Sequence, residues 1–325
     1  MSIKNKVLNY LEKKDGEFVS GQQLADTFNV SRTAIWKAIS ELRKEGAFIN
    51  AITNKGYYLV RESAKLSLES LEKELPDYNI SYFKEINSTN TYLKSIINED
   101  TTKKILVVSS KQLKGRGRLN RVFESPDGGI YFSLLIESHN NNDDNLLITS
   151  IAAVAISRAI KKVCNINTQI KWVNDIYIDD KKVCGILTEG IIDMEGGRIS
   201  SMVVGIGINF STPIDQFPKD LRDIVTSIYK NDNSIPKNIN RNILVKEIVN
   251  EINNIWDKLP NKDFLNEYRE KSNVINKYVN LYNKDNNVEK AYVKTINDKA
   301  HLVVELDNGE EREIGSGEVS IRVTK

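Results

Sequence analysis

The chain has 325 residues, of which 40% are hydrophobic and 28% are charged, and its net charge is +2. This length allows two or three domains with buried cores, and the nearly balanced charge excludes a polybasic nucleic-acid binder. No apolar run approaches the ~20 residues of a membrane span, and no apolar signal segment opens the chain, so we expect no membrane association. Two cysteines and two histidines give neither a disulfide framework nor metal-ligand spacing, which favours a cytoplasmic protein.

Residues 1–63 predict three helices followed by a β-ribbon. Apolar residues have helical spacing over 7–13, and two further helical patterns follow Ser20 and Ser31. Serine is a favoured N-cap because its hydroxyl accepts a hydrogen bond from the first helical turn. Two short alternating strands then flank Asn54-Lys55-Gly56, which is a hairpin signal. This order of elements predicts a winged helix-turn-helix.

The third helix of this segment has two different sides. Ile35, Ile39 and Leu42 fall on one stripe, which we expect to be buried. The exposed side is basic, which suits the major groove of DNA, and the ribbon can reach flanking phosphates. Residues 1–63 carry ten Lys or Arg and seven Asp or Glu, a mild basic excess. A small protein-binding winged helix is the alternative. The residues that we predict to contact DNA are Ser31, Arg32, Thr33, Lys37 and Lys55.

Residues 64–270 predict a mixed sheet with helices packed against it. Short turns join many of the strand patterns, so the sheet should be largely antiparallel or mixed. Strands are predicted at residues 79–86, 105–110, 130–137, 170–178, 183–192 and 199–210, and helices from residue 88 or 89, at residues 146–163 and at residues 241–259. Residues 62–76 join this segment to the winged helix.

Residues 271–325 predict a small β-barrel of SH3-like size. Short strand patterns alternate with turn residues such as Asn308-Gly309, and no set of side chains here would support chemistry alone. The whole chain is therefore predicted to be α+β, with three domains at residues 1–63, 64–270 and 271–325.

Four motifs in the central segment lie at strand ends or in loops, where ligands usually bind. They are INSTN at 86–90, KQLKGRGRLNR at 111–121, KWVND with KKVCGILTEG at 171–175 and 181–190, and GIGIN at 205–209. The second motif is the most informative, because three arginines in seven residues repel one another unless an anion lies among them. Arginine offers forked donors to carboxylate or phosphate, and glycine lets the backbone approach a ligand closely.

Each motif also has a simpler interpretation. The arginine–glycine stretch alone could be a solvated basic loop or an RNA-contacting segment. STN alone is usually a helix cap, and KWVND could be an ordinary strand end. GIGIN lacks the third glycine of the dinucleotide-binding pattern.

In this order, the motifs resemble those of the biotin protein ligase family. With the winged helix in front, the chain is similar to the bifunctional members that also repress transcription. GRGR followed by arginine, KW-x-ND and K-x-x-G-I-L-x-E carry the resemblance, which extends over essentially the whole chain. Two positions differ from the family pattern: Asn120 stands where glycine is frequent, and Val173 stands where proline is frequent.

The resemblance implies an ATP-dependent reaction in two steps with Mg²⁺. The biotin carboxylate attacks the α-phosphate of ATP to give biotinyl-AMP, and a lysine of a carrier domain then takes the biotinyl group. Arg116 and Lys182 are implied to bridge the two anions, while Asp175 either accepts a proton or holds Mg²⁺. The residues implied for biotin are Ser88, Thr89, Asn90, Gln112, Arg116, Gly117, Arg118, Lys182, Gly185, Gly205 and Gly207. The residues implied for ATP and the adenylate are Arg118, Arg121, Phe123, Lys171, Asn174 and Asn209.

The resemblance also implies partners. They are a biotin carboxyl carrier domain of acetyl-CoA carboxylase, pyruvate carboxylase or both, and operator DNA of biotin synthesis or uptake genes. The arginine loop should be disordered without ligand and fold over the adenylate, which would promote a homodimer with two winged helices. Two alternatives stay open: a lipoate or octanoate ligase, against which the GRGR loop and the winged helix argue, and a biotin sensor without catalysis, against which Lys182, Arg118 and Asp175 argue.

Overall fold

The structure is a computed structural model. It describes residues 2–14, 17–44, 47, 49–52, 55–59, 65–97, 104–139, 142–193, 197–236, 238–282, 288–315 and 320–323. The chain separates into two compact units, Met1–Lys65 with Tyr229–Arg241 and Leu66–Ile228 with Asn242–Lys325, and each unit is described by itself. Asn54 of the predicted hairpin and the predicted boundary between residues 63 and 64 lie outside the described residues. The division into three domains stays a prediction.

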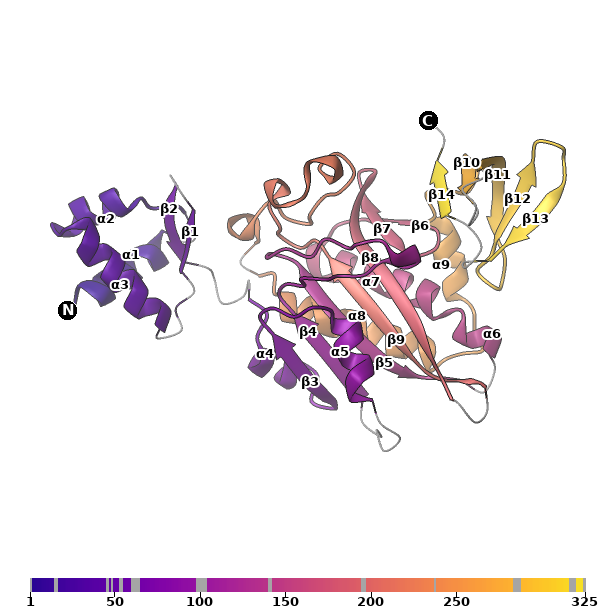
Figure 1. Cartoon of the computed structure of the whole chain (residues 1–325), viewed down its shortest axis with the longest axis horizontal. Helices are drawn as coiled ribbons and strands as arrows, with labels where there is room; N and C mark the ends of the chain where they lie inside the picture. Colours follow the sequence, from indigo (N-terminus) through magenta and orange to yellow (C-terminus); the bar gives the residue numbers. More distant parts are fainter. Residues whose placement is uncertain are drawn as a thin grey trace. The chain divides into compact units, whose positions relative to one another are not determined.

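The first unit contains the expected winged helix-turn-helix (Figure 1). Ser20 caps α2 in a capping box with Gln23, and the Ser31 hydroxyl accepts a hydrogen bond from the backbone N–H of Ala34 at 3.2 Å. The predicted buried stripe of α3 is confirmed, because Ile35, Ile39 and Leu42 are at most 2% exposed. The elements are α1 (Ile3–Lys13), α2 (Gly21–Phe28), α3 (Arg32–Lys44), β1 (Ile49–Ile52) and β2 (Gly56–Leu59).

The centre of the second unit is a seven-stranded sheet in the order β3-β4-β5-β9-β8-β7-β6. Strands β3 and β4 are parallel and the other neighbours are antiparallel, so the sheet is mixed as predicted. Its strands are β3 (Tyr78–Phe83), β4 (Lys104–Ser109), β5 (Ile130–Glu137), β6 (Gln169–Lys171), β7 (Asp175–Ile178), β8 (Lys181–Ile192) and β9 (Ile199–Ile208).

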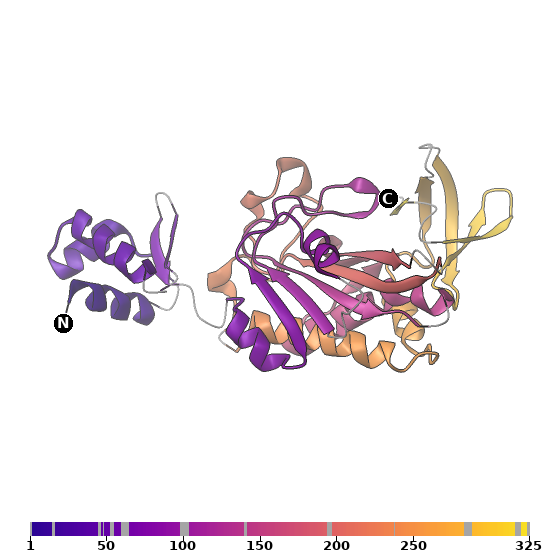
Figure 2. The same ribbon diagram turned by 60° about the horizontal axis from the view of Figure 1, so that its bottom comes forward.

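Helices cover both faces of this sheet. Figure 2 shows α7 and α8 on one face and α5 with the arginine loop on the other. Helix α5 packs on its face through Leu93, which lies in one buried cluster with Ile105, Val107 and Val203. The helices are α4 (Leu68–Glu74), α5 (Thr89–Ile96), α6 (Asn142–Asn145), α7 (Ile148–Cys164), α8 (Arg241–Trp256) and α9 (Phe264–Glu270), with short 3-10 turns η2 (Arg118–Asn120), η3 (Ile214–Gln216) and η4 (Lys219–Leu221). A further 3-10 turn, η5 (Asp232–Ser234), belongs to the first unit.

The C-terminal strands form a separate antiparallel sheet of five strands in the order β13-β12-β11-β10-β14. A turn of this sheet reaches the central one, because the Trp172 indole N–H donates to the Ala300 carbonyl at 2.9 Å. The strands are β10 (Tyr278–Tyr282), β11 (Val288–Ile296), β12 (Leu302–Leu306), β13 (Glu311–Ile314) and β14 (Ser320–Val323).

Two segments differ from the sequence prediction. The joining segment at residues 62–76 contains helix α4, which Ser67 caps. The strand predicted at residues 170–178 is two strands, β6 and β7, joined by a turn. The turn residue Asn174 accounts for the break. Its backbone carbonyl accepts a hydrogen bond from the Ile186 N–H of β8, and its side-chain amide donates one to the Ile186 carbonyl.

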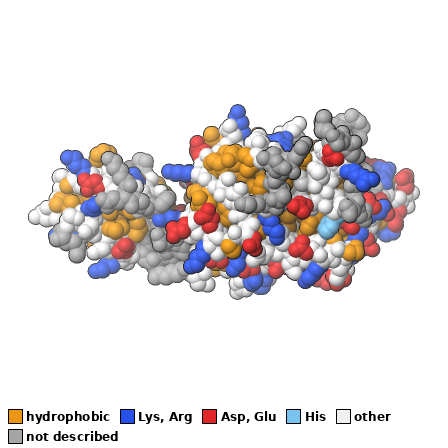
Figure 3. All heavy atoms as spheres, turned by 90° about the horizontal axis from the view of Figure 1, so that it is seen from below, with side chains coloured by type: hydrophobic (Ala, Val, Ile, Leu, Met, Phe, Trp, Pro, Cys, Tyr) orange, Lys and Arg blue, Asp and Glu red, His pale blue; other side chains and the backbone are white. Residues whose placement is uncertain are grey.

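Charged side chains of both signs are interspersed over the face shown in Figure 3, in keeping with the net charge of +2. Among the described helices, none has both the length and the apolar character needed to span a membrane.

Candidate functional site

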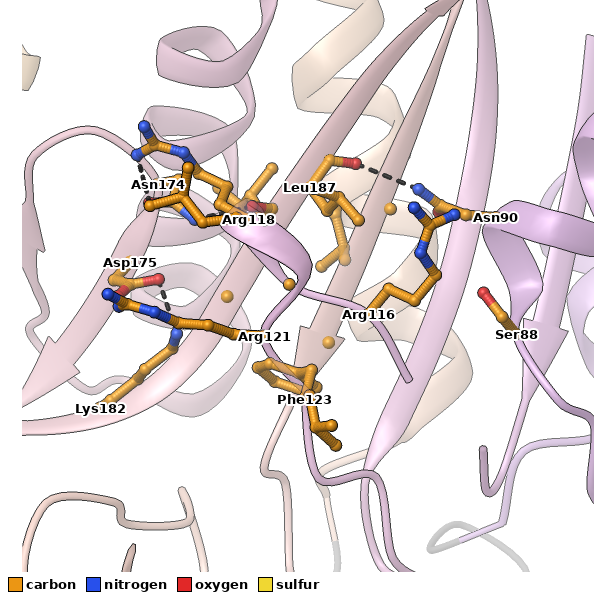
Figure 4. A pocket seen from close by; sticks show the side chains of 18 of the residues that line it. Ser88, Asn90, Arg116, Arg118, Arg121, Phe123, Asn174, Asp175, Lys182 and Leu187 are labelled. Atoms are coloured by element: carbon orange, nitrogen blue, oxygen red, sulfur yellow. Dashed lines mark hydrogen bonds and ion pairs between the residues drawn. The ribbon is translucent and has the colours of Figure 1, made fainter. Parts of the chain in front are cut away.

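A pocket lies over β8 and β9 on the sheet face that carries α5, between the arginine loop and the β6–β7 turn (Figure 4). Strand register explains this position. Gly185 pairs with Gly207, Leu187 with Gly205 and Glu189 with Val203, so alternate residues of both strands point to this face. The lining comprises Ser88, Thr89, Asn90, Gln112, Arg116, Gly117, Arg118, Leu119, Arg121, Val122, Phe123, Lys171, Trp172, Asn174, Asp175, Lys182, Gly185, Ile186, Leu187, Gly205, Ile206 and Gly207.

The charge of this lining is strongly unbalanced. Five basic side chains line the described pocket, from Arg116, Arg118, Arg121, Lys171 and Lys182, against one carboxylate, that of Asp175. Such convergence costs electrostatic energy unless an anion binds there. The lining therefore favours a bound anion, which was also the inference from the arginine–glycine stretch.

The polar end of the pocket is built around the start of α5. Ser88 caps the helix, while the backbone N–H and hydroxyl of Thr89 both donate to the Gln112 side-chain oxygen, at 2.9 and 3.1 Å. The Gln112 amide in turn donates to the Ser125 hydroxyl at 3.0 Å. Asn90 is 4% exposed and accepts a hydrogen bond from Ser133 of β5 at 2.6 Å. These bonds fix neutral donors and acceptors in one orientation.

The arginine loop is closed by its own backbone. Gly117 N–H donates to Arg121 O at 2.8 Å, and Phe123 N–H donates to Gly115 O at 3.0 Å. Leu119 and Asn120 between them have positive φ angles of 54° and 56°. Asparagine tolerates this left-handed conformation better than most residues, so it replaces the more frequent glycine at little cost. Disorder of the loop without ligand stays a prediction.

The opposite end of the pocket holds a lysine–aspartate pair. Lys182 Nζ lies 2.7 Å from Asp175 Oδ1 and 5.4 Å from the centre of the Phe123 ring. Arg118 extends from the loop to the β6–β7 turn, where its guanidinium donates to Asn174 Oδ1 at 3.3 Å. Burial lowers the pKa of Arg118, and the nearby Asp175 carboxylate partly offsets that effect.

Arg116 and Lys182, which were expected together at a carboxyl–phosphate junction, have different partners. Arg116 Nη1 lies 3.4 Å from Glu189 Oε1, beside Asn90, whereas Lys182 lies with Asp175 (Figure 4). Both side chains line the same pocket, and their predicted role in bridging the two anions stays a proposal.

The glycines at 185, 205 and 207 leave space above the sheet, and protein side chains fill part of it. A Cβ at Gly207 or Gly185 would collide with the Phe123 ring, and one at Gly205 would collide with the Asn90 side chain. The space above these glycines is thus covered by Phe123 at one end and by Asn90 at the other.

Asn209 is the one pocket residue of the sequence prediction that does not line the described pocket. It is 3% exposed, and its amide donates to the Thr226 carbonyl at 3.1 Å. The sequence interpretation missed Glu189, although it ends the K-x-x-G-I-L-x-E motif. It also missed the pocket residue Trp172 and gave no signal for Lys94 of α5.

In the winged-helix unit, the five residues predicted to contact DNA are all exposed. Arg32 and Thr33 line a groove between α3 and the β1–β2 ribbon, together with Trp36 and Ile52. Trp36 is 60% exposed on the outer side of α3, and the sequence interpretation assigned it no role.

The comparisons with known proteins agree with this geometry. Residues 82–209 match the model of the Biotin/lipoate A/B protein ligase family, and residues 4–58 match an HTH domain model. The chain is 38% identical over 232 residues to the Bifunctional ligase/repressor BirA of Bacillus spizizenii, covering 70% of this chain and 71% of that one. It is 26% identical over 312 residues to that of Escherichia coli, covering 95% and 94% of the two chains.

Among solved structures, the fold is similar to that of biotin protein ligase from Aquifex aeolicus in complex with biotin and ATP. The TM-score is 0.62 at 27% sequence identity, and the match covers 76% of this chain and 99% of that chain.

Proposed function

The chain belongs to the family of bifunctional ligase/repressors, so it is a biotin protein ligase and a DNA-binding repressor, and we propose how its residues divide this work. The observation that carries the proposal is the pocket with five basic side chains, one carboxylate and a fixed neutral polar end.

Biotin binds at the neutral end. Its ureido ring needs one acceptor for each N–H and donors for its oxygen, and Ser88, Thr89, Asn90 and Gln112 offer both kinds of group. Gly205 leaves the room that Asn90 occupies, and Leu187 supplies apolar surface for the rest of the ligand. The biotin carboxylate then points toward the basic side chains.

ATP binds at the basic end, with Arg118, Arg121, Lys171 and Asn174 around its phosphates. A carboxylate oxygen attacks the α-phosphorus, an O–P bond forms, and the bond to the leaving pyrophosphate breaks. Two anions must meet, so Lys182 and Arg116 stabilise the charge that accumulates between them. The Phe123 ring lies across Gly185 and Gly207 and shields the mixed anhydride from water.

Magnesium fits this pocket as an ion shared with the substrate. No group of three or more His, Cys, Asp or Glu side chains able to hold a metal occurs among the described residues. Mg²⁺ usually needs only one or two carboxylates when phosphates supply the other oxygens, and Asp175 is the carboxylate of the described lining. The ion would neutralise phosphate charge while Asp175 also keeps Lys182 in place.

In the second step, the amine of a carrier lysine attacks the biotinyl carbonyl carbon, an amide bond forms, and AMP leaves. The amine must lose a proton, and Asp175 is the group that we assign to accept it. We propose carrier domains of acetyl-CoA carboxylase, pyruvate carboxylase or both as substrates, and the cytoplasm as the compartment.

For repression, Arg32, Thr33 and Lys37 of α3 enter the major groove with Ser31, which precedes the helix, and Lys55 of the ribbon contacts flanking phosphate. We propose that the operator controls biotin synthesis or uptake genes. We further propose that adenylate binding favours a homodimer. A dimer would present two winged helices to an operator with two-fold symmetry. The five C-terminal strands are proposed to close as an SH3-like barrel.

The test combines both activities. The protein is incubated with biotin, ATP, Mg²⁺ and a carrier domain, and pyrophosphate release and the mass of the carrier are measured. We expect one biotinyl group on one lysine, none on a carrier with that lysine replaced by arginine, and none with lipoic acid in place of biotin. Absence of pyrophosphate release, or equal use of lipoic acid, would contradict the assignment.

A further inference from the structure

Glu189 of β8 connects three segments that are distant in the sequence. Its Oε1 accepts from Lys94 Nζ at 2.7 Å and lies 3.4 Å from Arg116 Nη1, while its Oε2 accepts from the Asn90 amide at 2.8 Å. Asn90 and Lys94 lie four residues apart on one side of α5, and Arg116 belongs to the arginine loop. One carboxylate thus joins the helix, the sheet and the loop at the polar end of the pocket.

The first consequence concerns the orientation of the Asn90 amide. The Asn90 nitrogen donates to Glu189 and to the Leu187 carbonyl at 3.3 Å, and its oxygen accepts from Ser133. With the amide reversed, the oxygen of Asn90 would face a carboxylate and a carbonyl, which is repulsive. Glu189 therefore fixes the Asn90 oxygen, an acceptor with a second lone pair, above Gly205, a residue of the pocket lining.

The second consequence concerns the charge on Arg116. Two cations share one Glu189 oxygen, and Lys94 has the shorter contact. Burial alone would raise the pKa of Glu189, but hydrogen bonds from Lys94 and Asn90 and the charges of Lys94 and Arg116 lower it, so the group is an anion at neutral pH. Because Lys94 remains on Glu189, Arg116 can move to a ligand anion without leaving an unpaired carboxylate behind.

We propose that Glu189 is a positioning residue for biotin recognition, because it orients the Asn90 oxygen toward a ureido N–H. Lys94 remains its counter-ion, so that Arg116 is available to the ligand carboxylate. This inference rests on the proposed function. It predicts that two variants of the same network affect different steps.

The Glu189→Gln variant replaces the carboxylate by a neutral amide, so Asn90 loses its hydrogen bond to a charged acceptor and its amide is no longer held in one orientation. We expect the KM for biotin to rise about 10- to 100-fold, as for one lost hydrogen bond to a charged group, with the KM for ATP within about twofold of wild type. The side-chain amide signals of Asn90 in a ¹⁵N spectrum should shift as well. The matched control is Glu85→Gln, which removes a carboxylate from the exposed pair with Lys111 at 2.6 Å and should change neither KM.

The Lys94→Met variant keeps the bond between Glu189 and Asn90 but makes Arg116 the remaining cation on Glu189. We expect the KM for biotin to stay within about twofold and kcat for adenylate formation to fall about two- to fivefold, the size of one partly exposed ion pair. This variant also tests the proposal if Glu189→Gln folds poorly.

The outcomes separate the two ideas. Wild-type protein that releases no pyrophosphate contradicts the proposed function itself. An active wild type with an unchanged biotin KM in Glu189→Gln, or a Lys94→Met variant whose biotin KM rises as much as that of Glu189→Gln, overturns the positioning role alone.

Discussion

Replacing Lys182 by alanine tests the basic end of the pocket most directly. The ammonium lies 2.7 Å from Asp175 Oδ1 and 5.4 Å from the centre of the Phe123 ring, and its side chain is 27% exposed. It is held in place and partly desolvated before any substrate binds. A preorganised donor of this kind stabilises charge that develops on the phosphate in the transition state.

The expected loss is a factor of about 10²–10³ in the rate of adenylate formation, or roughly 3–4 kcal/mol. A second effect comes from Asp175, whose carboxylate is 22% exposed and loses its ion pair. We expect this to lower the free energy of unfolding by about 1–3 kcal/mol. The loss of activity should nevertheless persist well below the melting temperature of the variant.

The assay is pyrophosphate release with biotin, ATP and Mg²⁺ in a single turnover, with thermal unfolding measured in parallel. Lys181→Ala is the matched control, because Lys181 precedes Lys182 on β8 and does not line the described pocket. Near-normal pyrophosphate release by a folded Lys182→Ala variant would remove this lysine from the mechanism. An equal loss in both variants would show that the effect is not specific to the pocket.

Three further outcomes are expected. Arg118→Gly loses the contact with Asn174 and a ligand contact, so biotinyl-AMP should dissociate about 10- to 100-fold faster and biotinylate bystander protein. Arg116→Ala should instead make little adenylate and label little bystander protein. Equally low labelling by both variants, with adenylate still retained by Arg118→Gly, would refute the retention role of Arg118. Operator binding should weaken steeply as the salt concentration rises. Removal of residues 1–63 should abolish operator binding while leaving biotin transfer in place. A truncated protein that still binds operator would show that DNA is recognised by another part of the chain. The pKa of Glu189 is lowered on folding, so its contribution to stability is present above its unfolded pKa of about 4.3 and is lost as pH falls through its folded pKa. The difference in unfolding free energy between wild type and Glu189→Gln should therefore shrink as the pH falls below about 4.3. A difference that is constant from pH 7 to 3 would contradict this.

Much of the local structure could be predicted from the sequence because its causes are local. Ser20 and Ser31 precede helices whose first-turn N–H groups need acceptors, and both caps occur as predicted. The stripe of α3 follows from helical periodicity alone. The density of arginine around Gly115 and Gly117 already favoured an anion site, because like charges at that spacing repel one another whatever the fold.

What the tertiary structure decided is which of these groups meet. The register of β8 on β9 places Gly185, Leu187 and Glu189 on the face of α5, and a shift of one residue would have placed them on the other face. Asn209, from the GIGIN motif, lies outside the described pocket, where its amide donates to the Thr226 carbonyl. Lys94 had no sequence signal, because a lysine on an exposed helix turn acquires a role only when a partner such as Glu189 is brought beside it. Residue types and their spacing thus determined the chemistry of the chain, and long-range strand pairing, which spacing along the chain does not encode, determined which residues share the pocket.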